Sequence, residues 1–409
     1  MGESTKKSMN TIQLPRNVQF LYEEHLARLE FASLGCEQIE RDGDHWNRMT
    51  AHVNGTSDLM LRTSAYLGTL DGKRSLYSTL NMPGYQGGRF NRTRSVNQYL
   101  THWIYPYQGK FHPQMIRALL NMVGAKPGHR VCEPFLGSGT TALEASMLGI
   151  DCIGVDLSPL CVLLTRVKTQ SWQSAAEIGA AVADIVSGPS LSDAALTAHY
   201  TNNRVKDFLL VAQMVTASDV SRRGRESLSA LRKNLLAMLA SVEAHAQAIR
   251  EFDLQPGNVE VHVGDCRNLE ASGIASDSID AVVTSPPYSI ALDYVKNDEH
   301  ALDALGVDTK ALRSVMTGVR GKGAKQKLAN YNADMRAMFR EVARVLKSGA
   351  PAAFVIGDAT VDGSEVTTTE DMTTWALDAG LRLERAIPKI VYGLYSIMKD
   401  EQILIFRKG

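Results

Sequence analysis

The chain has 409 residues, of which 44% are hydrophobic and 22% are charged, an ordinary composition for a globular protein that buries a large core. Lysine plus arginine and aspartate plus glutamate number 44 each, which excludes a global electrostatic attraction to nucleic acid, so that any DNA contact needs local positive charge. The sequence has no apolar run of about 18 residues and no signal-peptide core, which predicts a cytoplasmic protein without a membrane contact. The five cysteines are scattered without metal-site spacing, which predicts reduced thiols and no bound metal.

Residues 1–100 are of mixed character and form an N-terminal extension, a candidate DNA-recognition region. Apolar residues at helical spacing predict a helix within Val18–Leu34. The segment Asn81–Ser95 reads NMPGYQGGRFNRTRS, which predicts a loop. Arg89, Arg92 and Arg94 lie in this loop with no acid beside them and are candidate DNA-phosphate contacts.

Residues 101–172 begin a pattern of alternating strands and helices. His112–Val123 is a predicted helix with Pro113 in its first turn, His129–Pro134 a strand, Thr140–Leu148 a helix and Asp151–Val155 a second strand. Residues 173–257 then interrupt the alternation as a helical insertion. Within it, helical spacing predicts one helix over Asp193–Ala217 and a long one over Arg225–Phe252.

The alternation resumes in residues 258–409, which complete the catalytic domain begun at residue 101. The predicted strands are Val259–Val263, Ser278–Thr284, Ala350–Gly357, Leu381–Ile390 and Glu401–Phe406, and the predicted helices are Asn332–Leu346 and Thr368–Asp378. Seven strands with intervening helices predict an open α/β sheet whose last two strands form an edge hairpin.

A glycine-containing turn follows the first strand of this sheet. Residues 131–141 read VCEPFLGSGTT, in which Gly137 and Gly139 permit close approach of a ligand to the main chain and to the following helix N-terminus. Asp156 ends the next strand, where a carboxylate can bind both hydroxyls of a ribose. The third glycine of GxGxxG and the lysine of a P-loop are both missing, which favours a nucleoside without a pyrophosphate, such as S-adenosylmethionine. The alternative is a tight structural turn.

Asp265 ends the strand that follows the insertion, within VHVGDCR. A carboxylate at this strand end can accept a hydrogen bond from an adenine amino group. The alternative is a plain Gly-Asp turn.

The sequence IDAVVTSPPY at residues 279–288 places a rigid corner after a buried strand. Pro286 and Pro287 fix the backbone and leave their carbonyls in set directions. Ser285 Oγ and the Pro286 carbonyl could then accept both hydrogens of an exocyclic amine, while Tyr288 stacks on an extruded base. Such a corner would hold the amine nitrogen against a methylsulfonium group.

The motifs EPFLGSGTT and TSPPY together resemble the two signature motifs of the amino-methyltransferases of DNA, which modify cytosine N4 or adenine N6. The resemblance implies a class I methyltransferase fold, a target base at Ser285–Tyr288 and S-adenosylmethionine at the glycine turn. The segment YPYQGKFHPQ at residues 105–114 also resembles the part of these enzymes beside the methionine half of the cofactor; the alternative is a loop and helix cap. The implied cofactor site comprises Lys110, Phe111, His112, Pro113, Glu133, Phe135, Gly137, Gly139, Thr140, Thr141, Asp156, Leu157, Asp265 and Cys266.

Serine at the first place of the tetrad is more usual in the cytosine-N4 branch of this family. The resemblance therefore implies methylation of cytosine N4 in double-stranded DNA, and a cognate restriction enzyme could be a partner. Adenine N6 in DNA, a base amine in RNA such as guanine N2, and a catalytically inactive nucleic-acid-binding module stay as alternatives. The oligomeric state is left open.

A basic segment after the tetrad is a further candidate for contact with DNA. Thr309–Asn330 contains six cations and no acid, and its glycines predict a mobile loop on the rim of the active site. Its candidate phosphate contacts are Arg313, Arg320, Lys322 and Lys325, and the alternative is a solvated loop. Asp293 and Tyr294, just after the tetrad, are expected to shape the base pocket.

Overall fold

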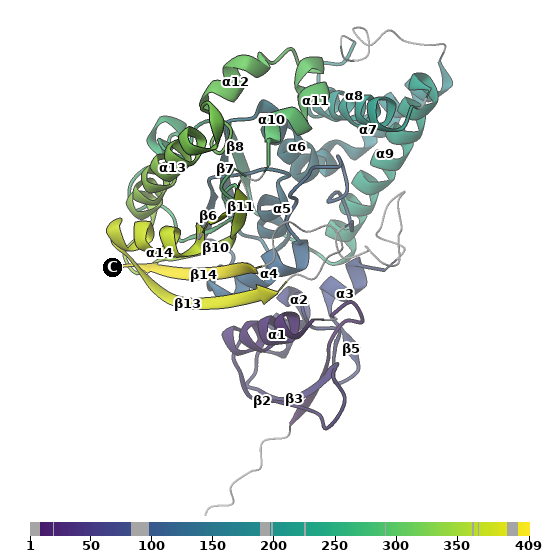
Figure 1. Cartoon of the computed structure of the whole chain (residues 1–409). Helices are drawn as coiled ribbons and strands as arrows, with labels where there is room; N and C mark the ends of the chain where they lie inside the picture. Colours follow the sequence, from purple (N-terminus) through teal and green to yellow (C-terminus); the bar gives the residue numbers. More distant parts are fainter. Residues whose placement is uncertain are drawn as a thin grey trace, which may run out of the picture.

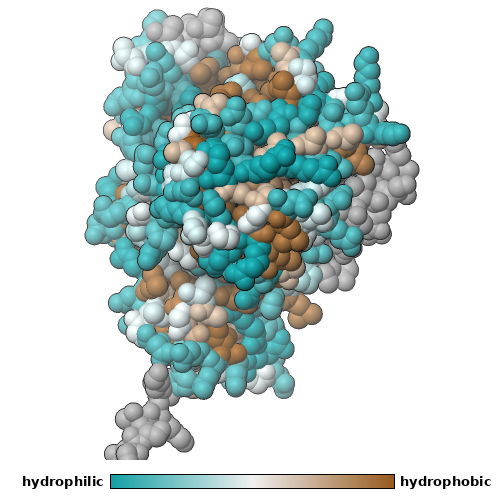
Figure 2. Space-filling view, turned by 90° about the vertical axis from the view of Figure 1, so that its left-hand side faces the viewer, coloured by the Kyte–Doolittle hydropathy of each residue, from teal (hydrophilic) through white to brown (hydrophobic). Residues whose placement is uncertain are grey.

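The computed structural model describes residues 9–18, 20–82, 98–188, 197, 199–224, 226–290, 292–361, 364–366, 368–390 and 400–409. Figure 1 shows an N-terminal part at the bottom, a central sheet covered by helices, and a group of long helices at the upper right. One face of the surface is largely hydrophilic with separate hydrophobic patches (Figure 2). None of the helices in these ranges is long and apolar enough to cross a membrane.

The central sheet has seven strands in the order β13-β14-β10-β9-β6-β7-β8. β8, β7, β6, β9 and β10 run parallel, and β14 is antiparallel to both β10 and β13. The predicted open α/β sheet with an edge hairpin is confirmed, and the fold is that of a class I methyltransferase. The strands are β6 Arg130–Glu133, β7 Asp151–Asp156, β8 Val259–Val263, β9 Ala281–Thr284, β10 Pro351–Gly357, β13 Leu381–Ile390 and β14 Asp400–Lys408.

Strand order reverses at β6, which has β7 on one side and β9 on the other. In open α/β sheets the carboxyl ends of the strands at such a reversal form the ligand-binding crevice. The glycine turn follows β6, Asp156 ends β7, and the diproline corner follows β9. The topology therefore brings the three sequence motifs to one crevice.

Helices cover both faces of the sheet because its strands are apolar on both faces. In β10, Ala353 and Val355 belong to the core on one face, whereas Phe354 and Ile356 belong to the core on the other. The first core contains residues of α4 Pro113–Met122 and α5 Thr140–Met147, and the second contains residues of α13 Gly323–Val345 and α14 Thr368–Asp378. The remaining helices near the sheet are α6 Pro159–Gln170, α10 Tyr294–Asn297 and α11 Glu299–Ala304, and a small hairpin joins β11 Ala359–Val361 to β12 Ser364–Val366.

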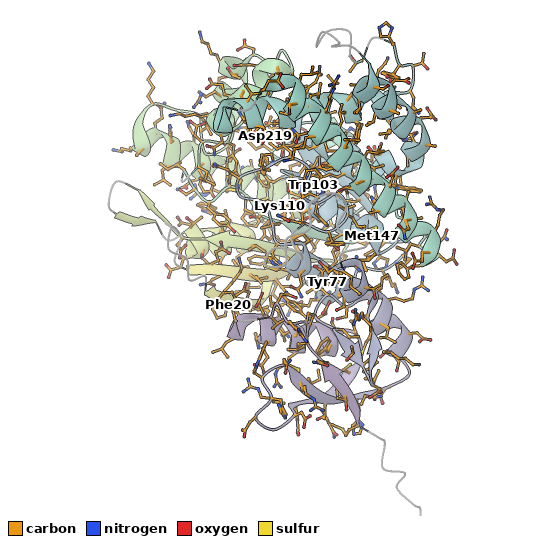
Figure 3. All side chains as sticks on the ribbon, turned by 90° about the vertical axis from the view of Figure 1, so that its right-hand side faces the viewer. Phe20, Tyr77, Trp103, Lys110, Met147 and Asp219 are labelled. Atoms are coloured by element: carbon orange, nitrogen blue, oxygen red, sulfur yellow. The ribbon has the colours of Figure 1, made fainter. Side chains whose placement is uncertain are left out.

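The insertion consists of α7 Ala175–Ser187, α8 Asn203–Arg223 and α9 Ser227–Glu251. α8 begins ten residues later than the predicted Asp193, because the Asn202 side chain caps it by accepting from the Arg204 N–H at 2.9 Å. α9 lies within the predicted Arg225–Phe252. Trp103 donates to Ser241 Oγ of α9 at 2.5 Å and lies beneath the insertion helices in Figure 3. This hydrogen bond connects the insertion to the segment that precedes α4.

The N-terminal part forms its own antiparallel sheet in the order β2-β3-β1-β4-β5, which the sequence analysis did not predict. It contacts the catalytic domain through a buried carboxylate, because Glu30 accepts from the Ala65 N–H at 2.8 Å and from Asn121 Nδ2 of α4 at 2.7 Å. Its elements are β1 Asn10–Gln13, α1 Leu21–Ser33, β2 Cys36–Arg41, β3 Arg48–Val53, α2 Ser57–Thr63, β4 Thr69–Leu70, β5 Lys73–Arg74 and α3 Leu76–Leu80.

The prediction of a mobile loop over Thr309–Asn330 is wrong. Residues Thr309–Val315 form α12, because Asp308 caps this helix by accepting from the Lys310 and Ala311 N–H groups, both at 3.0 Å. α13 begins at Gly323, well before the predicted Asn332. The glycines of this segment serve the turn between the two helices, where Gly318 has a φ of +79°.

Candidate active site

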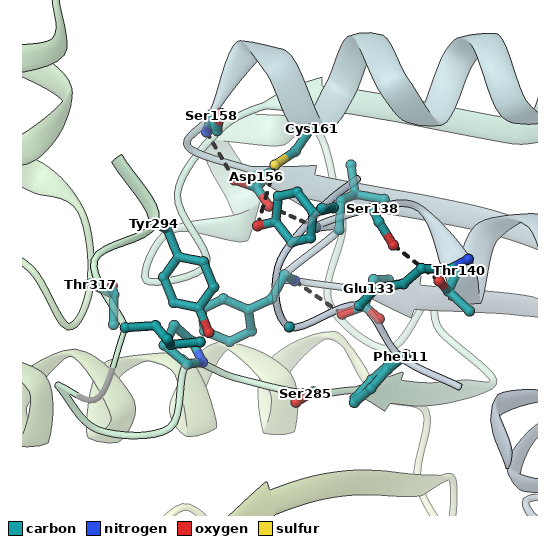
Figure 4. Close-up of a pocket in the computed structure, with 18 of the residues that line it drawn as sticks. Phe111, Glu133, Ser138, Thr140, Asp156, Ser158, Cys161, Ser285, Tyr294 and Thr317 are labelled. Atoms are coloured by element: carbon teal, nitrogen blue, oxygen red, sulfur yellow. Dashed lines mark hydrogen bonds between the residues drawn. The ribbon is translucent and has the colours of Figure 1, made fainter. Parts of the chain in front are cut away.

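One pocket at the carboxyl ends of β6, β7 and β9 is lined by residues of both signature motifs. Figure 4 shows Asp156 and Ser158 at one end of this pocket, Ser285 and Phe111 towards the other, and Glu133 between them. The lining residues from the predicted cofactor site are Lys110, Phe111, His112, Glu133, Phe135, Gly137, Thr140, Thr141, Asp156, Leu157 and Cys266; those from the tetrad are Ser285, Pro287 and Tyr288.

The glycine turn has a backbone that only glycine adopts without strain. Gly137 and Gly139 have φ values of +49° and +75°, in the left-handed region. A Cβ on Gly139 would lie 2.5 Å from Thr165 Oγ1, and one on Gly137 would lie 3.4 Å from the Tyr107 ring. Gly139 therefore allows the turn to pack closely against Thr165 and is absent from the pocket lining, whereas Gly137 lines the pocket beside Tyr107.

Asp156 joins the glycine turn to the start of α6. Its Oδ2 accepts from the Gly137 N–H and its Oδ1 from the Ser158 N–H, both at 2.9 Å. Burial raises the pKa of this carboxyl, and the two backbone donors oppose that rise. Each carboxylate oxygen has capacity for a further hydrogen bond, so the side chain can hold the turn and still accept from ribose hydroxyls.

Glu133 connects the cofactor turn to the strand that carries the tetrad. It accepts from the Phe135 N–H at 3.1 Å and from Thr141 Oγ1 at 2.7 Å, and Thr284 Oγ1, one residue before the tetrad, also donates to it. Burial raises the pKa of Glu133 to about 8 despite these hydrogen bonds. Glu133 was predicted in the cofactor site, whereas its hydrogen bond from Thr284 was not predicted.

Lys168 is a second connection that the sequence analysis missed. Its ammonium is buried and donates to the Ser138 carbonyl of the glycine turn at 2.7 Å. Burial lowers the pKa of Lys168 to about 7. No motif signals this residue, because a lysine in the last turn of a helix such as α6 is an ordinary feature of sequence.

The wall formed by residues 110–113 contributes three lining side chains. Lys110 Nζ donates to the His102 carbonyl at 2.7 Å, and Phe111 and His112 face the pocket. Burial, reinforced by the charges of Lys389 and Lys110, lowers the pKa of His112 to about 3, so its imidazole is neutral at ordinary pH. Pro113 is buried at the first position of α4 and is absent from the lining.

The tetrad is held from behind by residues outside both motifs. Tyr331 of α13 donates to the Pro287 carbonyl at 2.7 Å. The Tyr288 ring packs over Gly357 of β10, where an added Cβ would lie 2.9 Å from it. Ser285 Oγ donates to the Pro286 carbonyl at 3.5 Å, so the two groups that were predicted to accept from an amine lie side by side, although Pro286 is absent from the pocket lining.

Two aromatic rings complete the pocket between the cofactor turn and α12. Tyr107 and Tyr294 stack with ring centroids 6.5 Å apart and an interplanar angle of 19°, and both line the pocket. Tyr294 was expected near the base. Asp293 caps α10 and forms an ion pair with Arg313 at 2.5 Å, and it does not line the pocket.

Asp265 does not line the pocket, although its neighbours Gly264 and Cys266 do. Its carboxylate accepts from Arg267 Nε at 2.8 and 2.9 Å. Burial alone would raise the pKa of Asp265, but the hydrogen bonds and charge of Arg267 lower it. The adenine contact proposed for Asp265 stays a prediction.

The candidate phosphate contacts divide into three groups. Arg89, Arg92 and Arg94 lie outside the described residues. Arg313 and Arg320 form ion pairs with Asp293 and Asp334, each at 2.5 Å, so acidic residues from outside the segment contact these two cations, and their contact with phosphate stays a prediction. Lys322 and Lys325 are exposed at the start of α13 and have no ion pair with any residue that the structure describes.

The described residues contain no group of three or more His, Cys, Asp or Glu arranged to hold an ion. The strand order, the glycine turn and the acceptors of Asp156 fit S-adenosylmethionine. The fold and site thus have the features of a class I S-adenosylmethionine-dependent methyltransferase.

Parts of this chain are similar in sequence to known methyltransferases. The family described as UPF0020, RMKL-like, methyltransferase domain, matches residues 104–190. The type II methyltransferase M.BsoBI of Geobacillus stearothermophilus is 23% identical over 302 residues, 58% of this chain and 59% of that protein. The tRNA (guanine(10)-N2)-dimethyltransferase of Methanothermobacter thermautotrophicus is 33% identical over 66 residues, 16% of this chain and 20% of that protein. The chain is therefore similar in part to methyltransferases named for DNA and for tRNA.

Among solved structures, TrmN from Thermus thermophilus aligns with 97% of this chain and 81% of its own, with a TM-score of 0.37 and 12% identity. The chain spans about three fifths of the length of M.BsoBI and a smaller share of the tRNA enzyme.

Proposed function

We propose that this methyltransferase acts on DNA and transfers a methyl group to the exocyclic amine of an extruded base, cytosine N4. The observation that carries the proposal is that the glycine turn and the diproline corner line one pocket and are joined by the hydrogen bond from Thr284 to Glu133. A methyl donor on the turn and an acceptor at the corner can then share a single reaction space.

S-adenosylmethionine, when bound, supplies a methyl group activated by its sulfonium. The task of the chain is alignment. Ser285 Oγ and the Pro286 carbonyl accept the two amine hydrogens, which turns the nitrogen lone pair away from the ring, and Tyr288 stacks on the base. The N–CH₃ bond forms as the S–CH₃ bond breaks, the sulfur keeps that electron pair, and one amine proton leaves to water. No general base is needed for that loss, and burial lowers the pKa of His112 to about 3, which makes its imidazole a poor proton acceptor.

The choice of base rests on the first residue of the tetrad. Serine is neutral and resembles the cytosine-N4 branch, and relatives named type II methyltransferases favour DNA. Methylation of guanine N2 in RNA is the second candidate, because relatives named tRNA (guanine-N2) methyltransferases also match. Adenine N6 in DNA is the third.

DNA would approach over the start of α13. Lys322 and Lys325 are exposed cations of this rim without an ion pair to a described residue, and they would supply the local charge that a neutral chain needs. The extension of residues 1–100, with Arg89, Arg92 and Arg94, is proposed to contribute recognition of the DNA. A cognate restriction enzyme is proposed as a functional partner.

The test is transfer of a tritiated methyl group from S-adenosylmethionine to double-stranded DNA or to tRNA, combined with calorimetry of cofactor binding. We expect label in DNA only, and loss of this label in Ser285→Ala with cofactor affinity unchanged. Label in tRNA alone would refute the DNA proposal. Equal loss of transfer and cofactor binding in Ser285→Ala would make the corner a structural element.

A further inference from the structure

We propose that Lys389 recognises the ring edge of the target base and that Glu401 positions its ammonium group. The inference rests on the proposed function, because it concerns the base that the tetrad holds. It adds a base-reading element from the edge hairpin, a part of the fold outside both signature motifs.

The two residues face each other at the end of the hairpin nearest the pocket. Lys389 of β13 pairs in register with Glu401 of β14, and their side chains form an ion pair with 13% and 12% exposure. Both line the same pocket as the tetrad. An ion pair this well shielded from water contributes little net stability, because desolvation offsets the attraction. Its position in the pocket therefore suggests a role in recognition.

The neighbours of the pair place it at the base end of the pocket. Glu401 is in register with Gly357 of β10, and a Cβ on that glycine would meet the Tyr288 ring at 2.9 Å and Glu401 Cγ at 3.3 Å. Glu401 and Tyr288 thus lie beside each other over a residue with no side chain. On the other side, the charge of Lys389 contributes to the lowered pKa of His112.

The tetrad can accept both hydrogens of an exocyclic amine, but these hydrogen bonds do not distinguish cytosine, adenine and guanine. In cytosine the ring atom next to N4 is N3, a hydrogen-bond acceptor, and in adenine the atom next to N6 is N1, also an acceptor. In guanine the amine lies between N1, which carries a hydrogen and is a donor, and N3, an acceptor beside the glycosidic bond. A group beside the corner that donates to the ring atom next to the amine would accept cytosine or adenine and would oppose guanine when guanine presents its N1 edge.

The ammonium group of Lys389 can donate a hydrogen bond to this ring atom. Its ammonium has three N–H donors and no acceptor, so one donor can stay on Glu401 while another reaches cytosine N3. Glu401 would hold the flexible side chain of Lys389 in one direction and lower the entropy lost on base binding. A guanine N1–H at this place would face the Lys389 ammonium, which is also a donor, and its acceptor would have to be the Glu401 carboxylate that Lys389 contacts.

The experiment compares Lys389→Met and Glu401→Gln with two control variants, Arg382→Met and Glu384→Gln. The control residues belong to the same hairpin but lie at its other end, where Glu384 pairs with Arg407 at 2.7 Å. Each variant is assayed for S-adenosylmethionine affinity by calorimetry, for kcat and KM of tritium transfer to DNA, and for the methylated nucleoside by mass spectrometry.

We expect Lys389→Met to lower kcat/KM by roughly 10- to 100-fold, the scale for loss of a charged hydrogen bond, with cofactor affinity within about twofold of wild type. Glu401→Gln should lower it less, and the two controls should match wild type. Wild-type kcat/KM in Lys389→Met, or a parallel loss of cofactor affinity, would overturn the inference. A wild-type product of N2-methylguanine in RNA would refute the proposed function itself, whereas N4-methylcytosine with an unaffected Lys389→Met would refute the role of Lys389 alone.

Discussion

Replacing Asp156 by alanine should weaken cofactor binding through two separate effects. The carboxylate loses the acceptors assigned to the ribose, and it also releases the Gly137 and Ser158 N–H groups that it now holds at 2.9 Å. Loss of a charged acceptor costs about 1–3 kcal/mol, which corresponds to roughly a 5- to 150-fold rise in Kd. Isothermal titration calorimetry with S-adenosylmethionine measures this change directly.

Asp151→Ala provides a matched control at the other end of the same strand. Asp151 also accepts a backbone hydrogen bond, from the Asn258 N–H at 2.8 Å, but it does not line the pocket. It should therefore leave the Kd within about twofold of wild type. A Kd for Asp156→Ala equal to that of Asp151→Ala would refute the assignment of Asp156 to the cofactor.

Three further predictions concern the glycine turn and the diproline corner, the basic surface at the start of α13, and the buried carboxyl of Glu133. Gly139→Ala should lower both thermal stability and cofactor affinity, because its Cβ would lie 2.5 Å from Thr165 Oγ1. Gly357→Ala should instead impair methyl transfer and leave cofactor affinity unchanged. If calorimetry and transfer assays gave the same result for the two variants, the turn and the corner would not have separate roles. Lys322→Glu combined with Lys325→Glu should weaken DNA binding and reduce its salt dependence, and an unchanged salt slope in fluorescence anisotropy would remove this surface from the interface. In Glu133→Gln, the free energy of unfolding should fall less steeply between pH 5 and 8 than it does in the wild-type protein. Over that range the native fold keeps the Glu133 proton, since its pKa is raised to about 8, while the unfolded chain releases it, so the wild-type free energy of unfolding falls with rising pH by up to about 1.4 kcal/mol per pH unit. Urea unfolding at several pH values measures this slope, and equal slopes in the two proteins would show that Glu133 is ionised in the fold.

The sheet and the motif positions could be predicted from sequence because each depends on local pattern. Apolar runs such as Ala350–Gly357 predict strands buried on both faces, and parallel strands bring their carboxyl ends together. The glycine turn and the diproline corner follow such strands, and they line one pocket as that geometry requires.

The connections between distant segments could not be predicted in this way. Lys168 reaches the Ser138 carbonyl across 30 residues, and Thr284 reaches Glu133 across 151; neither contact leaves a periodic signal. For Asp265 the contact is local. The strand-end pattern predicted that its carboxylate binds a ligand, but in the structure this carboxylate accepts from Arg267, two positions away.

The short elements were missed for a different reason. β4 of the N-terminal sheet has only two residues, too few for an alternating pattern to appear. The cations of Thr309–Val315 and the glycines that follow it predicted a loop. The structure has a helix there, and its start is marked in the sequence by the capping residue Asp308. Glycine content therefore indicated a mobile segment where the structure has two helices and a turn.

The central claim is that the Ser285–Tyr288 corner presents cytosine N4 to the methyl group of S-adenosylmethionine. Mass spectrometry of nucleosides from the DNA of cells that express this protein, or its Ser285→Ala variant, tests it most directly. The account predicts N4-methylcytosine with the wild-type protein and none with the variant. N6-methyladenine in place of N4-methylcytosine, or equal amounts of N4-methylcytosine with both proteins, would contradict it.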